Sequence, residues 1–299
     1  MRTIYITLLI ILPQMISSRT IFVAEEGSLY RKGLLHIESV SYIRFENIMV
    51  RNSRNVGIYV KGPGTANIEL VNCKTDDTYN SGIGIWYADS VLVKGCEITR
   101  ANNQDMRPEG FPLRREAPHE ALTLAGATNF TVTENHIHSC YKEGIDCKEV
   151  SSHGVIFNNY IHDLPRQGLY VDCWFGMLEN VEIYSNIVHD CEWGAAISGE
   201  GKDAKMKNIR LHHNILYNNR ASGILFGVWG HAFNGESPLM ELPMYENPWK
   251  ADFRLKNCSV AIGAGIAIEG YGAKDLGAVP FKEEDITRTP SFLQNREDE

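Results

Sequence analysis

Residues 144–199 read GIDCKEVSSHGVIFNNYIHDLPRQGLYVDCWFGMLENVEIYSNIVHDCEWGAAISG, and this stretch repeats one short pattern. Copies begin at Gly144, Gly168 and Gly194. Each opens with glycine, continues through alternating apolar residues and a polar turn, and leads to an Asn in the next apolar run. Short alternating runs that end at polar turns are typical of half-buried strands rather than helices.

The same pattern extends to both sides of this stretch. Its opening positions are Gly57, Gly82, Ala121, Gly144, Gly168, Gly194 and Gly223, with steps of 25, 39, 23, 24, 26 and 29 residues. A repeat of this length, made of two or three short strands, buries its apolar side only when neighbouring copies stack. The sequence therefore predicts an all-β fold, a parallel β-solenoid of about seven to nine turns.

Asparagines recur at nearly one place in each copy. They are Asn47, Asn72, Asn135, Asn159, Asn186 and Asn214. Asn tolerates the left-handed backbone of a tight bend, and stacked amides can hydrogen-bond one another along a repeating strand array. We expect these residues to form a structural ladder.

These repeats, the asparagine column and phrases such as VIFNNYIHD and NIRLHHNILYNN resemble the right-handed parallel β-helix proteins of the pectin-lyase-like superfamily. The resemblance covers about residues 33–230. It implies a right-handed solenoid, and it implies an exported protein that acts on polysaccharides, because many bacterial polysaccharide lyases and some glycoside hydrolases are found in this group. One fold hosts many activities, so the resemblance is less specific for chemistry.

Two further segments resemble the same group. TIFVAEEGS at 20–28 is similar to the opening strand of its members, and AIGAGIAIEGYGAKDLGAVPF at 261–281 is similar to a closing segment. The longer first turns that usually follow the opening strand are missing. This departure puts in doubt whether the chain is a complete enzyme.

The N-terminus has the layout of a secretory signal peptide. Arg2 is followed by an apolar run at 4–12, by Pro13 and by small residues at Ser17 and Ser18. The apolar run is shorter than the roughly 20 residues that a membrane-spanning helix needs. We expect a signal peptide at 1–18, a β-helix domain at 19–281 with loop insertions at 99–118 and 230–249, and a charged tail at 282–299. The protein is then secreted or periplasmic, without stable membrane insertion.

Charge and cysteine content exclude some classes of function. The formal charge is -8, from 37 acidic and 29 basic residues, so the chain has no general basic field to attract nucleic acid. Seven cysteines cannot all pair, and no CxxC motif occurs, so neither a full disulfide framework nor a zinc cluster is indicated. The cysteines are expected to be small buried apolar residues.

Strand alternation predicts which side chains face outward. Ile145 and Cys147 point to the core, and the residues between them point away from it. The outer surface then collects Thr123, Asp146, Lys148, Tyr170, Asp172 and Ser198. Lys148 and Asp172 stand side by side on turns about 4.8 Å apart, with Asp146 diagonal to Asp172 at about 8 Å. Glu149, Glu200 and Trp174 lie just beyond, in the adjoining bend.

Such a cluster suits a glycoside hydrolase. One carboxylic acid protonates the leaving oxygen, and a second carboxylate acts as nucleophile or activates water. Asp146 and Asp172 are the first candidates, with Glu149 and Glu200 in reserve.

The cluster also suits a polysaccharide lyase. Lys148 would act as base if its surroundings lower its pKa, and the carboxylates at 146, 149, 172 and 200 could hold Ca²⁺. Arg107, Arg114 and Arg115, in the insertion at 99–118, could meet the carboxylates of a uronic substrate. A net charge of -9 after loss of the signal peptide, which carries only Arg2, argues against a polyanionic substrate.

Structural roles remain open for all these residues. An exposed Lys148–Asp172 pair would be an ordinary cross-strand ion pair, worth no more than about 1 kcal/mol. His138, His162 and His189 are expected to stack as a structural ladder. His119 and Glu120 end the first insertion, where they could contact substrate or transfer a proton. Sugar rings could stack on the aromatic residues of the outer face, Trp86, Tyr170 and Trp174, or these could cover apolar surface.

The sequence thus predicts a monomeric, exported solenoid that cleaves glycosidic bonds of a polysaccharide or oligosaccharide in an outer groove. The hydrolase and lyase mechanisms remain alternatives. A non-catalytic carbohydrate-binding or cell-surface solenoid is the second hypothesis.

Overall fold

The computed structural model describes residues 33–109, 117–226, 245–247 and 252–255. The predicted signal peptide, the segments at 20–28 and 261–281, the charged tail and most of the second insertion lie outside these residues. Within the described ranges, no helix is long and apolar enough to cross a membrane.

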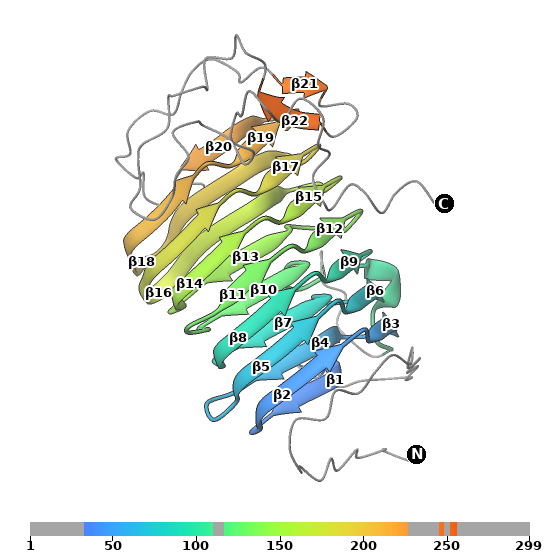
Figure 1. Cartoon of the computed structure of the whole chain (residues 1–299). Coiled ribbons are helices and arrows are strands. Elements are labelled where there is room, and N and C mark those ends of the chain that lie inside the picture. Colours follow the sequence, from blue (N-terminus) through green and yellow to red (C-terminus); the bar gives the residue numbers. More distant parts are fainter. Residues whose placement is uncertain (1–32, 110–116, 227–244, 248–251, 256–299) are drawn as a thin grey trace.

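The described chain winds into stacked turns with three faces (Figure 1). The first face consists of β1 (Gly33–Glu38), β4 (Val56–Lys61), β7 (Ile83–Trp86), β10 (Leu122–Ala125), β13 (Ile145–Lys148), the first parts of β16 (Gln167–Tyr184) and β18 (Trp193–His212), and β20 (Ser222–Phe226). The second face consists of β2 (Ser41–Glu46), β5 (Ala66–Val71), β8 (Asp89–Lys94), β11 (Thr131–Thr133), β14 (Ser152–Phe157) and the last parts of β16 and β18.

The third face is a separate seven-stranded sheet. It consists of β3 (Met49–Ser53), β6 (Lys74–Thr78), β9 (Glu97–Thr99), β12 (His136–His138), β15 (Tyr160–His162), β17 (Ile187–His189) and β19 (Ile215–Tyr217). A short 3-10 helix, η1 (Gln104–Met106), follows β9, and β21 (Tyr245–Asn247) pairs antiparallel with β22 (Asp252–Leu255).

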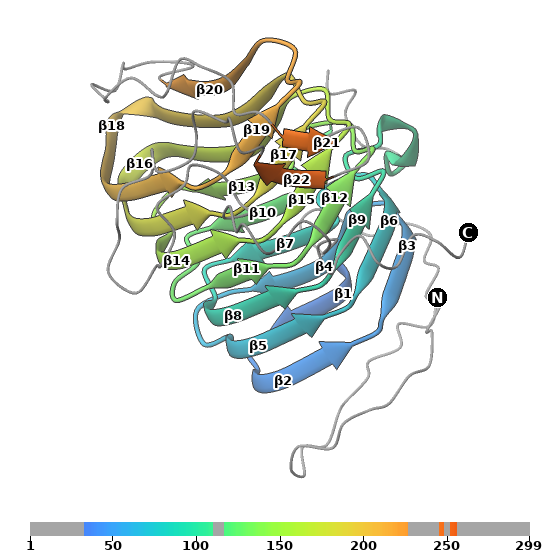
Figure 2. The ribbon, with the colours of Figure 1, turned by 45° about the horizontal axis from the view of Figure 1, so that its top comes forward.

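Pairing along all three faces is parallel, which confirms the predicted parallel solenoid. Because β16 and β18 run unbroken through the bend between the first two faces, those faces join into one 13-stranded sheet. Figure 2 shows the turns along the stack, with β16 and β18 bending around one side. The seven strands of the third face correspond to seven turns, at the lower end of the predicted range.

Close backbone contact explains the opening glycines. A Cβ atom on Gly144 would lie 2.4 Å from the carbonyl oxygen of Gly168, and one on Gly57 would lie 2.5 Å from that of Gly82. No side chain fits at these distances, so the turns that open at Gly57 and Gly144 need glycine where the next turn passes over them, whereas Ala121 opens its turn with a small side chain.

The inward residues of successive turns form one continuous core. Ile145 and Cys147 lie in it, as alternation predicts, next to Leu169 and Val171 of the following turn. Six cysteines of the described residues are free and buried, which confirms their expected apolar role for all except Cys258, outside those ranges. Stacking therefore buries an apolar side that one turn alone leaves in water.

The asparagine ladder is confirmed for four turns and corrected for two. The side-chain nitrogen of Asn135 donates to Asn159 Oδ1 at 2.9 Å, Asn159 donates to Asn186 at 2.9 Å, and Asn186 donates to Asn214 at 2.9 Å. Asn47 and Asn72 instead occupy the preceding position, with φ of 57° and 50°. The ladder position itself holds Cys73 and Cys96 in neighbouring turns, as the strand register shows. The prediction missed this shift because asparagine suits both the ladder and the left-handed bend.

Candidate functional site

The candidate site lies on the outer side of the first face, on β10, β13, β16 and β18. Lys148 is the register partner of Asp172, and Asp146 is the partner of Tyr170, as strand alternation predicts. Asp172 in turn pairs with Ser198 on the next strand. Parallel stacking therefore brings residues from separate repeats onto one patch of surface.

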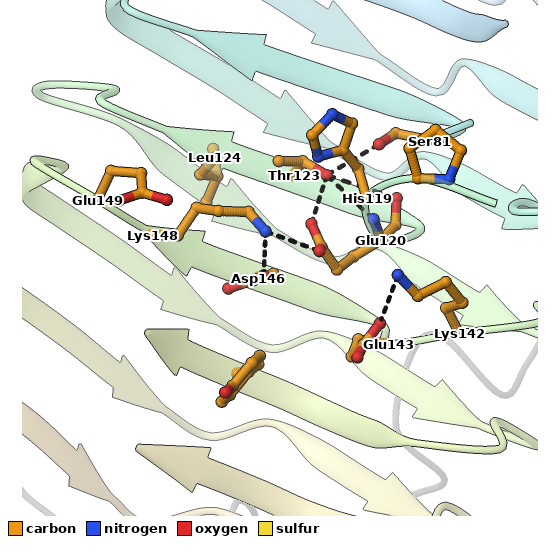
Figure 3. Close-up of polar contacts among 12 residues, drawn as sticks. Ser81, His119, Glu120, Thr123, Leu124, Lys142, Glu143, Asp146, Lys148 and Glu149 are labelled. Carbon is orange, nitrogen blue, oxygen red and sulfur yellow. Dashed lines mark hydrogen bonds and ion pairs between the residues drawn. The ribbon is translucent and has the colours of Figure 1, made fainter. Parts of the chain in front are cut away.

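Lys148 is the centre of the cluster (Figure 3). Its ammonium nitrogen lies 2.7 Å from Glu120 Oε1 and 2.8 Å from Asp146 Oδ2. Thr123 Oγ1 donates to the other oxygen of Glu120 at 2.9 Å, and the hydroxyl of Ser81 lies 2.8 Å from Thr123 Oγ1. The structure thus gathers the predicted residues Glu120, Asp146 and Lys148, and the prediction did not single out the supporting hydroxyl of Ser81.

The carboxyl groups of the cluster differ in the direction in which their pKa values are shifted. Burial raises the pKa of Glu120, but the cations of Lys148, His119 and Lys142 together lower it to about 2. Burial raises the pKa of Asp172 to about 7 against the opposing effect of the Lys148 ammonium. Burial and the nearby Asp172 carboxylate raise the pKa of Asp146 well above its usual range. One ammonium therefore keeps one carboxyl group ionised and leaves others close to protonation at neutral pH.

The cluster is not the open, solvated patch that the sequence suggests. Asp146 is 0% exposed, Asp172 is 4% exposed and Lys148 is 9% exposed, and Tyr170 is also buried. Alternation predicts the side of the sheet on which a residue lies but not what packs over that side. The alternative of an exposed Lys148–Asp172 ion pair is therefore wrong, because Lys148 is buried and forms its ion pairs with Glu120 and Asp146.

Four oxygens of the cluster have no hydrogen-bond partner within the described part of the chain. They are Asp146 Oδ1 and Oδ2, Asp172 Oδ1 and Ser198 Oγ, and of these Asp146 Oδ2 lies 2.8 Å from the Lys148 ammonium in an ion pair. Asp172 and Ser198 are register neighbours, so two of these oxygens come from adjacent strands. Buried polar atoms in native proteins are nearly always hydrogen-bonded, and exceptions mark places where a ligand or a reaction can use them.

The bend beyond β13 and β16 provides an exposed border to this cluster. Trp174 is 57% exposed, and its backbone nitrogen donates to Glu149 Oε2 at 3.4 Å. Glu200 accepts a hydrogen bond from the hydroxyl of Tyr170. Burial raises the pKa of Tyr170, so its hydroxyl stays a neutral donor.

The other described residues that were predicted to contact substrate do not lie on this exposed border. Trp86 is only partly exposed, and its ring meets the ring of His119 edge-on with centroids 4.9 Å apart. Of the three predicted aromatic contacts, only Trp174 is therefore well exposed. Arg114 and Arg115 lie outside the described residues.

The conditions for a lysine base are not met. Burial lowers the pKa of Lys148, but the carboxylates of Asp146, Glu120 and Asp172 outweigh it and raise the pKa well above its usual range. A lysine base needs the opposite shift, and Lys148 is held in ion pairs with Glu120 and Asp146. Within the described residues, three histidines on the third face, His136, His138 and His162, have possible metal-ligand atoms within 4.8 Å of one another.

The histidines stack on the outer side of the third face as predicted. The rings of His138 and His162 have centroids 5.0 Å apart at 7°, and those of His162 and His189 have centroids 5.0 Å apart at 2°. His136 also joins this group, with its ring 4.2 Å from that of His138. His136 was not predicted to join the stack, although the two histidines in HIH alternate along the strand and must share a face.

Comparisons with solved structures return proteins of distant sequence. Tailspike protein 2 of Escherichia coli O157:H7 bacteriophage CAB120 is 10% identical with a TM-score of 0.33, and the match covers 70% of this chain and 28% of that one. The tailspike protein gp49 of Pseudomonas phage LKA1 is 10% identical with a TM-score of 0.23, and the match covers 65% of this chain and 43% of that one. The surface adhesin PfbA of Streptococcus pneumoniae is 11% identical with a TM-score of 0.23, and the match covers 62% of this chain and 72% of that one. This chain therefore spans less than half the length of both tailspikes.

Family membership rests on the sequence itself. A search of curated protein sequences finds no match. The family model described as "right handed beta helix region" matches residues 33–208 and 116–234, which together make up more than half of the chain. The parallel turns of the structure agree with this match. The chain belongs to the right-handed β-helix family.

Proposed function

We propose that this chain is an exported enzyme that binds a polysaccharide or oligosaccharide across the bend of β16 and β18 and hydrolyses a glycosidic bond there. Asp172 is the proton donor. Glu200 is the carboxylate that activates water or attacks the sugar. Asp146 and Lys148 set the electrostatics around Asp172 from within the buried cluster.

One observation carries the proposal: the carboxyl groups around Lys148 have pKa values pushed apart, with Glu120 at about 2 and Asp172 at about 7. A carboxyl group that keeps its proton near neutral pH can protonate a leaving oxygen. Ionised carboxylates nearby favour the positive charge that develops on the sugar during hydrolysis. Asp172 Oδ1 has no partner in the described chain and can therefore take up a new contact.

The bend supports substrate binding next to Asp172. Trp174 presents a largely exposed ring on which a sugar could stack. Glu149 and Glu200 are only partly buried, and their charges act on Asp172. Tyr170 holds Glu200 from the side of the sheet, so this carboxylate is oriented before substrate arrives.

A second function, carbohydrate binding without cleavage, is favoured by the burial of the carboxylate cluster. Asp146 is 0% exposed, and Lys148 is held by two carboxylates. In this alternative the cluster is a buried support, and Trp174 with the half-buried residues of the bend makes the binding surface.

A polysaccharide panel separates these functions. Neutral and uronic polysaccharides are incubated with the full chain, with and without chelator, and both reducing ends and the absorbance of unsaturated products are measured. New reducing ends without unsaturated product support the hydrolase. Unsaturated product would instead indicate a lyase, and binding without either product would leave the non-catalytic function.

Variants then test the assignment of residues. Asp172→Asn and Glu200→Gln are each expected to lower kcat by about 10²–10⁴-fold, the usual contribution of a general acid or base. Glu134→Gln is the matched control, because Glu134 is exposed after β11, away from the bend of β16 and β18, and the change should leave kcat unchanged. Wild-type turnover in Asp172→Asn would refute the proposed site.

A further inference from the structure

We propose that His136, His138 and His162, on the outer side of the third face, form a binding site for a divalent transition-metal ion, with Zn²⁺ as the fitting ion. The site lies on a different face of the solenoid from the carboxylate cluster. It does not depend on the proposed hydrolase activity.

The fold brings the three imidazole rings together. His136 and His138 are the first and last residues of β12, so both point to the same side, and His162 ends the neighbouring strand β15 in register with His138. One possible ligand nitrogen from each ring lies within 4.8 Å of the others. The three ligands therefore come from two adjacent turns.

The shortest contact joins two ring nitrogens. His136 Nε2 lies 2.8 Å from His162 Nε2, so one of the two must carry a proton and the other must accept it. Asp163 Oδ2 lies 2.7 Å from His162 Nδ1, and since an ionised carboxylate only accepts, that nitrogen carries the proton of the neutral ring. The lone pair of His162 Nε2 then points to His136.

A metal ion can take the place of the shared proton. When an ion binds both Nε2 atoms, the proton of His136 Nε2 moves to the other ring nitrogen or to solvent, so neither ring needs a net charge. A tetrahedral Zn²⁺ ion with bonds of about 2.0–2.1 Å holds its nitrogens about 3.3 Å apart. The contact of 2.8 Å needs only a small opening to reach this spacing.

Carboxylates support two of the three ligands. Asp163 orients His162 through Nδ1, the arrangement that commonly fixes a metal-binding imidazole. Glu97 Oε1 lies 3.5 Å from His138 Nε2 on the neighbouring strand β9, where it can serve as a fourth ligand or hold His138. Its other oxygen is held by Lys74 at 2.7 Å.

The site is open enough for an ion to enter. The side chain of His138 is 22% exposed, and His136 is also partly exposed. Three imidazoles with a nearby carboxylate are ligands that suit Zn²⁺ and its neighbours in the transition series, whereas Ca²⁺ and Mg²⁺ prefer oxygen.

His189 is the histidine of this stack that is not proposed as a ligand. It continues the same stack, but its Nδ1 lies 2.6 Å from Asp190 Oδ2 and its Nε2 lies 2.9 Å from the hydroxyl of Tyr160. Both of its nitrogens lie next to oxygen atoms, and so do those of His138, whose Nδ1 lies 3.1 Å from Ser139 Oγ and whose Nε2 lies 3.5 Å from Glu97 Oε1. The direct contact of two ring nitrogens at His136 and His162 is different, and it is this pair, with His138 within ligand distance, that supports a metal site.

Calorimetric titration of the metal-free full chain with Zn²⁺ tests the site. The wild type is expected to bind one equivalent. His136→Phe keeps an aromatic ring in the stack but removes a ligand, so it should weaken binding by about tenfold or more. Asp163→Asn, at a side chain that is 59% exposed, should weaken binding by about 10–100-fold without disturbing the fold.

His189→Phe is the matched control and should bind Zn²⁺ as the wild type does. Absence of Zn²⁺ binding by the wild type would overturn the proposal. Equal affinity of the wild type, His136→Phe and Asp163→Asn would overturn it too, because the ion would then lie elsewhere, for example on cysteine. If His136→Phe does not fold, Asp163→Asn and the wild type alone decide the outcome.

Discussion

The solenoid contains two buried polar arrays that satisfy their hydrogen bonds to different degrees. In the asparagine ladder, the side-chain nitrogen of Asn159 donates to Asn186 Oδ1 at 2.9 Å and to the carbonyl of Val132 at 3.1 Å. Its oxygen accepts from the backbone nitrogen of Asn135 at 3.0 Å and from its side chain at 2.9 Å. The ladder therefore satisfies itself by repetition alone.

The carboxylate cluster does not satisfy itself in this way. Asp146 Oδ1, Asp172 Oδ1 and Ser198 Oγ lack hydrogen-bond partners in the described residues, and three carboxylates share the Lys148 ammonium. The ladder has a structural role, because it closes the bends of four successive turns in the same manner. A stacked fold does not need the cluster, which carries desolvated charge at a cost in stability. This difference is the physical reason to look for function on the first face.

The largest expected effect is that of Lys148→Met. This change removes the ammonium that lies 2.7 Å from Glu120 and 2.8 Å from Asp146, and it leaves the buried Glu120 without its ion-pair partner. We expect a loss of about 3–5 kcal/mol in the free energy of unfolding, measured by urea denaturation. Lys205→Met, at an exposed position of β18, is the control. Equal stability of the two variants would mean that the ion pair contributes nothing.

Asn159→Ala tests the ladder. It removes the amide that bonds to Asn186, Val132 and Asn135, and it leaves buried donors and acceptors without partners. The expected loss is about 2–4 kcal/mol in the free energy of unfolding. Asn158→Gly is the control, because Asn158 is exposed and has a φ of 55°, which glycine adopts without strain. The ladder is supported only if Asn159→Ala lowers the free energy of unfolding strongly and Asn158→Gly changes it little.

The fold could be predicted from the sequence because its physical causes are local and repeated. Gly144 and Gly168 mark where turns touch, and Ile145 and Cys147 mark the inward side. Alternation also placed Asp146, Lys148 and Asp172 on one outer face.

The environment of the site could not be predicted in the same way. Alternation says nothing about what covers a face, so the burial of Asp146 was missed. Lys148 binds Glu120, which is 28 residues earlier and precedes its strand, so strand register alone does not identify this partner. The direction of the Lys148 pKa depends on the number of carboxylates around it, which only the three-dimensional structure shows.

Asp172→Asn is expected to raise the free energy of unfolding, whereas Lys148→Met and Asn159→Ala are expected to lower it. Burial raises the pKa of Asp172 from 3.8 to about 7, so the folded state binds its proton more tightly than the unfolded state does. The stability contributed by this proton is complete below about pH 4 and is lost as the pH rises through 7. Asn resembles the protonated form, so at pH 7 or above the variant should be more stable by an amount on the order of 2 kcal/mol.

Urea denaturation across pH 4–8 measures this effect, with Asp203→Asn as the exposed control. The wild type should lose stability relative to Asp172→Asn as the pH rises, while the control should follow the wild type. Higher stability together with lost turnover would identify Asp172 as a residue kept for function at a cost in stability. A constant difference across this pH range would contradict the raised pKa.

The smallest effects come from two hydroxyls on the same outer face. Thr123 donates to Glu120 Oε2 at 2.9 Å, whereas Ser198 Oγ has no partner in the described chain. Thr123→Val should therefore cost about 1.5 kcal/mol, because the buried carboxylate loses a donor. Ser198→Ala should change the free energy of unfolding by less than about 0.5 kcal/mol in the absence of substrate, because no bond is lost. If Ser198 contacts a bound saccharide, Ser198→Ala will instead raise KM, which Thr123→Val, remote from the bend, should leave unchanged. An equal loss in the free energy of unfolding for both changes would mean that Ser198 Oγ has a hydrogen-bond partner in the folded protein. Ser198 would then be satisfied like the asparagines of the ladder.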